Sequence, residues 1–142
     1  MSASSPLRRI GQLLSGLVVL TLFADGAVQL FQPSLVAAEM ASSGWPVELA
    51  PVIGGIAILC ALLYALPQTA VLGAILIAGF TGGAIATHLR LGEIGSGPQL
   101  LCITIGVAAW AGLWLRGRIS REPEMLPSRS AIAAPVRQRR AA

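Results

Sequence analysis

The chain has 142 residues, of which 55% are hydrophobic and 11% are charged, and its mean hydropathy is +0.76. Soluble domains carry about 25% charged residues, so an ordinary water-soluble domain of this size is excluded. An intrinsically disordered chain is also excluded, because such chains are poor in apolar residues. The two cysteines are too few for a disulfide scaffold.

Four segments are long and apolar enough to cross a bilayer, which requires about 20 helical residues. A first helix is predicted at about 10–31, and only Asp25 interrupts its apolar character. The charge-free run from Leu49 to Leu89 divides at Pro67 into helices at about 48–66 and 69–89. A fourth helix is predicted at about 98–115. We therefore expect an all-α membrane protein in which residues 1–116 form a four-helix transmembrane bundle.

The first of these helices also has features of a secretory signal peptide, because Arg8 and Arg9 precede its apolar run. The run, however, exceeds the roughly 7–15 residues that are usual for the apolar part of a signal peptide. This length favours a helix that is retained.

The arginines predict the orientation, since cytoplasmic loops are enriched in positive charge. With four spans, nine of the ten arginines lie on the side that holds both termini, and only Arg90 lies on the other. Tyr64, Trp110 and Trp114 are predicted near the inner interface, which amphipathic rings favour. We expect a multi-pass protein of the bacterial cytoplasmic (inner) membrane with both termini in the cytoplasm.

Residues 117–142 differ from the bundle in composition, with six arginines, three prolines and few large apolar side chains. Such a stretch buries too little surface to order itself, so a disordered cytoplasmic tail is predicted. Its arginines suit anionic lipid headgroups, and the alternative is a docking segment for nucleic acid or a partner. We favour the lipid surface and expect no nucleic-acid partner.

Motifs for catalysis by this chain alone are missing. The sequence has no phosphate-binding glycine loop, no CxxC and no HExxH, and it contains one histidine. A metal site needs three or four protein ligands, which a lone histidine and scattered carboxylates do not assemble. We predict no metal site, no cofactor held by the chain itself, and no independent catalysis.

Small residues characterise the predicted helix at 69–89. Gly79 and Gly83 form a GxxxG pair, and Gly82 lies beside them. Small residues let membrane helices approach closely, so we predict that these glycines pack helices together. The alternative is a thin wall beside the path of a ligand.

A polar stripe is predicted along the first helix, formed at helical spacing by Gly11, Ser15, Thr21, Asp25, Gln29 and Gln32. Polar groups at membrane depth need partners inside the protein, so this face should point into the bundle. Asp25 could serve as an ion-pair partner, as a proton-handling carboxylate or as part of a polar pocket.

Polar residues gather near the outer face, and the candidate polar or ion-pair site consists of Asp25, Gln29, Glu48, His88 and Arg90. Arg90 continues the small-residue face through Gly79 and Gly83, which we expect to meet the first helix. An arginine fork suits a carboxylate, so an Asp25–Arg90 ion pair is predicted. Glu48 and Glu93 are the alternative partners of Arg90.

The stretch from Leu63 to Arg90, LYALPQTAVLGAILIAGFTGGAIATHLR, resembles the DoxX-like family of small four-helix membrane proteins. Asp25 and the ending WAGLWLR, residues 110–116, also match the family pattern. The chain departs from that pattern at Gln68, where the family usually has arginine, and at Thr81, where a larger apolar residue is common.

The resemblance implies a membrane protein related to subunits of quinone-linked redox complexes, although most members have no assigned reaction. We therefore expect an accessory or scaffold subunit embedded in the lipid bilayer, with redox partner subunits, and with quinone reached through the complex. A homo-oligomer is a further expected form. The alternative function is a small permease or lipophile-binding protein that uses the polar face of the first helix.

Overall fold

The computed structural model describes residues 5–117, so the predicted tail lies outside the described residues except for Gly117. The elements are α1 (Ser5–Phe31), α2 (Pro33–Ser42), a 3₁₀ turn η1 (Val47–Leu49), α3 (Ala50–Ala65), α4 (Ala70–Arg90) and α5 (Gly97–Leu115). Four of these helices are long and apolar enough to cross a membrane, at Pro6–Phe31, Val47–Ala65, Ala70–Arg90 and Gly97–Leu115. The predicted all-α, four-span membrane fold is confirmed.

Helix α2 was not among the predicted elements, because a segment of 10 residues is too short to cross a membrane. Pro33 stands at its beginning, where a missing backbone N–H costs nothing. Alanine, leucine, glutamate and methionine follow, and these residues favour helix. The connection between the first two spans is therefore itself helical.

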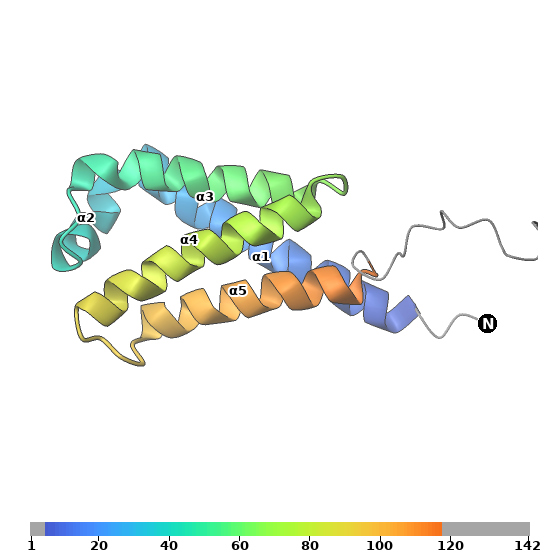
Figure 1. Ribbon diagram of the computed structural model, residues 1–142. Coiled ribbons are helices and arrows are strands. Elements are labelled where there is room, and N and C mark those ends of the chain that lie inside the picture. Colours follow the sequence, from blue (N-terminus) through green and yellow to red (C-terminus); the bar gives the residue numbers. More distant parts are fainter. Residues whose placement is uncertain (1–4, 118–142) are drawn as a thin grey trace, which may run out of the picture.

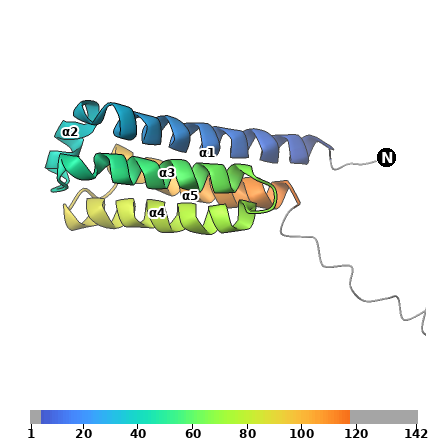
Figure 2. The same cartoon turned by 90° about the horizontal axis from the view of Figure 1, so that it is seen from above.

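The four long helices form a square in which α1 and α4 lie on one diagonal and α3 and α5 on the other. Helix α1 packs against α3 and α5, and α4 packs against the same two helices. Figure 2 shows α1 and α4 on opposite sides of α3 and α5. The first residues of α1 and the last of α5 lie at one end, called here the amino-terminal end, and α2 lies at the other, the α2 end (Figure 1).

Small side chains fill much of the interior, while large apolar side chains cover the outside. Tyr64, Ile77 and Leu113 are the largest fully buried side chains, and alanines from α3, α4 and α5 pack around them. Leu13, Leu17 and many other large aliphatic residues are exposed. This distribution is typical of helices that pack closely together within lipid.

Glycines bring the helices into backbone contact at several places. A Cβ atom added to Gly54 of α3 would stand 2.6 Å from the carbonyl oxygen of Gly26 in α1. A Cβ on Gly73 of α4 would collide with the backbone of Tyr64 in α3. At the amino-terminal end, a Cβ on Gly11 would lie 2.7 Å from the Cβ of Leu115. These positions can hold only glycine without moving a helix.

The predicted packing role of Gly79, Gly82 and Gly83 within this chain is wrong. All three are exposed, and a Cβ atom added to any of them would meet nothing within 4 Å. The inward face of α4 carries Gly73, Ala74, Ile77 and Thr81 instead. Gly79 and Gly83 each follow an inward residue by two positions, a rotation of about 200° that places them on the outside.

The substitution Gly54→Ala should destabilise the bundle by about 1–3 kcal/mol, because the new methyl group meets helix backbone rather than a movable side chain. The neighbouring Gly55→Ala is the matched control, since its Cβ would meet nothing within 4 Å. Thermal unfolding in detergent measures both. Equal melting temperatures for the two variants would contradict the close α1–α3 crossing.

Candidate functional site

The polar residues predicted near the outer face all lie at the α2 end, but they form separate contacts rather than one site. Asp25 of α1 accepts a hydrogen bond from the Gln29 side-chain amide at 2.7 Å. Glu48 lies exposed in η1. His88 pairs with Glu93 at 2.8 Å, between the last turn of α4 and the loop that follows.

The predicted Asp25–Arg90 ion pair is wrong. The Nη2 atom of Arg90 donates a hydrogen bond to the carbonyl oxygen of Ser43 at 2.8 Å. The physical reason is the arrangement of the helices, because α1 and α4 are diagonal neighbours and do not pack together. Arg90 instead places its positive charge at the carboxyl end of α2, where the helix dipole favours a cation.

The polar stripe of α1 points inward only in part. Ser15 and Gln29 are buried, whereas Asp25 and Gln32 are exposed. The buried stripe of this helix runs through Ser15, Val18, Leu22, Gly26 and Gln29. Asp25 precedes Gly26 by one residue, which turns its side chain about 100° away from the interior.

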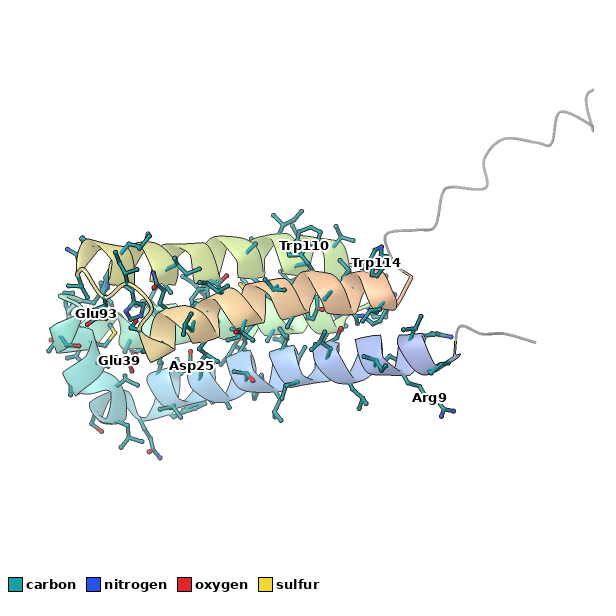
Figure 3. The ribbon with its side chains drawn as sticks, turned by 90° about the horizontal axis from the view of Figure 1, so that it is seen from below. Arg9, Asp25, Glu39, Glu93, Trp110 and Trp114 are labelled. Atoms are coloured by element: carbon teal, nitrogen blue, oxygen red, sulfur yellow. The ribbon has the colours of Figure 1, made fainter. Side chains whose placement is uncertain are left out.

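Glu39 of α2 also lies at this end, and it was not among the predicted site residues. Figure 3 shows Glu39 and Asp25 of α1 at the same end of the bundle. Among residues 5–117, no group of three histidine, cysteine or acidic side chains is placed to hold a metal ion. Helix α2 was not predicted, so no sequence signal placed Glu39 there.

A second polar cluster lies inside the bundle, and its centre is Tyr64. The side chain is fully buried, at 0% exposure. Its hydroxyl donates to the Ala109 carbonyl oxygen of α5 at 2.7 Å and lies 3.0 Å from the Ser15 hydroxyl of α1. The phenol has one hydroxyl hydrogen, which it donates to the Ala109 carbonyl oxygen. In the hydrogen bond between the two hydroxyls, Ser15 is therefore the donor.

This cluster joins three helices and bridges a diagonal of the square. Tyr64 belongs to α3, and its hydroxyl donates to a carbonyl oxygen of α5, the helix diagonally opposite. A Cβ atom on Gly112 would stand 2.5 Å from the Ser15 hydroxyl oxygen, so glycine there makes room for the pair. Tyr64, predicted near the inner interface, lies in the last turn of α3 with its side chain turned into the core, while Trp110 and Trp114 are exposed.

Arg116 lies next to this cluster, directly after α5. Its Cζ atom is 5.0 Å from the centroid of the Tyr64 ring, a cation–π contact. Its Nε and Nη2 atoms are buried and have no hydrogen-bond partner among residues 5–117. From the sequence, Arg116 is only one of the charges that orient the chain, because helical spacing cannot show that its guanidinium folds back over Tyr64.

The sequence pattern of the DoxX-like family matches residues 13–112, from the first span into the last. The chain belongs to the DoxX-like family. Ser15, Tyr64 and Ala109 of the internal cluster fall within the matched residues, and Arg116 falls outside them. No curated protein and no solved structure matches the chain.

Replacing Tyr64 with phenylalanine should lower the stability of this DoxX-like protein by about 0.5–2 kcal/mol, because the Ser15 hydroxyl loses its acceptor in the core. Ser15→Ala should also destabilise, and the double variant should lose less than the sum of the two. Thermal unfolding in detergent gives the three values. Thr104→Val, which alters an exposed hydroxyl of α5, is the control. Additive losses would mean that the two hydroxyls do not interact.

Proposed function

We propose that this DoxX-like protein is an accessory subunit of a quinone-linked membrane redox complex. In this role it supplies a lipid-embedded four-helix module, and a partner subunit supplies the redox group. The observation that carries the proposal is the uncovered small-residue face of α4, with Gly79, Gly82 and Gly83 open on the outside. Membrane helices associate most closely over such faces, so a partner's transmembrane helix is a fitting occupant. The redox character rests on the family resemblance.

The geometry supports an accessory subunit better than a permease or lipophile carrier within one chain. A path between the polar face of α1 and the glycine face of α4 requires these two faces to meet across the interior. The glycine face points outward, and Tyr64, Ile77 and Leu113 occupy the interior. Asp25 and Gln32 lie on the outside of α1 rather than along an internal route.

Purification of the tagged full-length chain in mild detergent tests this proposal through the proteins and small molecules that accompany it. We expect a partner subunit together with quinone. Gly79→Leu and Gly83→Leu should lose that partner and keep the melting temperature of the parent, because nothing in the chain contacts either position. Gly16→Leu on α1 is the matched control, since Gly16 is also exposed with nothing within 4 Å.

Two results would contradict the accessory role. One is full retention of the partner by both α4 variants, and the other is transport of a solute by the purified chain in liposomes. A second copy of this chain as the partner, detected with two differently tagged copies, would replace the hetero-complex with a homo-oligomer.

We also propose that the protein lies in the bacterial cytoplasmic membrane with both termini in the cytoplasm. Support comes from the arginines, nine of which lie on the side of the termini. A reporter fused after Ala142 should be active only if it is a cytoplasmic reporter. Activity of a periplasmic reporter at the same position would reverse the orientation.

A further inference from the structure

The guanidinium of Arg116 is half-enclosed and lacks an acceptor for its hydrogen bonds. Nε and Nη2 are fully covered and unpaired within residues 5–117, while the residue as a whole is only half-buried. The Tyr64 ring, 5.0 Å from Cζ, attracts the positive charge. A ring face does not satisfy the in-plane N–H groups, and unsatisfied donors of a charged group are costly to bury.

No acidic residue of the described chain lies at this end of the bundle. Asp25, Glu39, Glu48 and Glu93 all lie toward the α2 end, where Figure 3 labels three of them. The amino-terminal end carries Arg8 and Arg9 in addition to Arg116. The local excess of positive charge selects an anion as the missing acceptor, and the planar guanidinium fork suits two oxygens of a phosphate.

Arg116 lies at the level along the bundle where lipid headgroups are expected. The last span ends at Leu115, so Arg116 lies where a membrane-spanning helix leaves the apolar layer. Trp114, 63% exposed, is the kind of side chain that lies among headgroups. A largely exposed apolar surface formed by Ile10, Leu13, Leu14 and Leu17 runs along this end of α1. It begins beside Gly11, the residue that contacts the end of α5.

We infer that Arg116, whose guanidinium lies against Tyr64 with Nε and Nη2 covered and unpaired within residues 5–117, turns outward to bind the phosphate of an anionic phospholipid at the amino-terminal end of the bundle. The exposed apolar surface of α1 at this end accommodates an acyl chain of the same lipid. Arg8 and Arg9 add positive charge nearby, which favours a headgroup without a compensating cation. This inference is independent of the proposed redox role, since it concerns Arg116 at the amino-terminal end and not the outward glycine face of α4.

Native mass spectrometry of the full-length protein in mild detergent tests the site, with phosphatidylglycerol and phosphatidylcholine added at equal concentrations. The parent should retain phosphatidylglycerol preferentially. Arg116→Gln should reduce that retention about tenfold, which corresponds to the loss of one hydrogen bond to a charged group. Arg9→Gln is the matched control, because Arg9 is exposed at the same end and points away from the other helices (Figure 3). Its retention should fall by much less than tenfold, because Arg9 supplies only positive charge at a distance and no direct contact with the phosphate.

Equal losses in the Arg116 and Arg9 variants would overturn the site, because they would indicate a diffuse charge effect. If Arg116→Gln does not fold, Arg116→Lys decides, since lysine keeps the charge and lacks the fork. Retention by the lysine variant below that of the parent supports the phosphate contact, and retention equal to the parent contradicts it.

Two further arms distinguish other acceptors. Inorganic phosphate that raises the melting temperature as much as phosphatidylglycerol does would identify a site for a small anion instead of a lipid. The full chain with Glu122→Gln and Glu124→Gln should retain lipid as the parent does. Increased lipid retention in that variant would mean that Glu122 or Glu124 pairs with the Arg116 guanidinium in the parent, and the inference would fail.

Discussion

The hydroxyl of Tyr64 is the polar contact around which the bundle is arranged. It lies in a fully buried position and joins α3 to α1 through Ser15 and to α5 through the Ala109 carbonyl. Inside a membrane, water cannot replace such bonds, so the helices must be held where the donors and acceptors meet. The glycines at 73 and 112 are explained by the same constraint, because each leaves room for Tyr64 or its partner.

This arrangement determines what the outside of the molecule presents. With Gly73, Ala74 and Ile77 of α4 packed toward the interior, the glycines at 79, 82 and 83 point outward. With α5 held beside Tyr64, Arg116 reaches the aromatic ring as soon as the helix ends. The uncovered glycine face of α4 and the guanidinium of Arg116, unpaired within residues 5–117, are thus both consequences of how the core is packed.

The two ends of the bundle differ in charge and in the way their charges are used. At the α2 end, Asp25 and Arg90 bind a side-chain amide and a backbone carbonyl, and His88 pairs with Glu93. The contacts of Arg90 and His88 tie the end of α2 and the loop after α4 to α4, whereas the Asp25–Gln29 bond lies within α1. At the amino-terminal end, arginines accumulate without acidic partners among the described residues, which suits contact with the phosphates of a membrane surface. Membership of the DoxX-like family agrees with such a lipid-embedded module.

Much of the fold followed from the sequence. Runs of apolar residues, interrupted by Pro67 and by loops rich in glycine, determined the number of spans and their approximate limits. The motif between Leu63 and Arg90 indicated the family. These properties depend on composition and on order along the chain, and the bilayer imposes the length of each span.

The tertiary structure alone decided which faces meet. Helical periodicity shows that Gly79, Gly83 and Arg90 share one face of their helix, but it does not show which other helix that face meets. The square arrangement puts α4 diagonal to α1, so Asp25 and Arg90 have different partners. Tyr64 contacts Ser15, which is 49 positions away in the chain, and Ala109, which is 45 positions away. Arg116 contacts Tyr64 across 52 positions. Such contacts depend on how four helices share one interior, which no local pattern specifies.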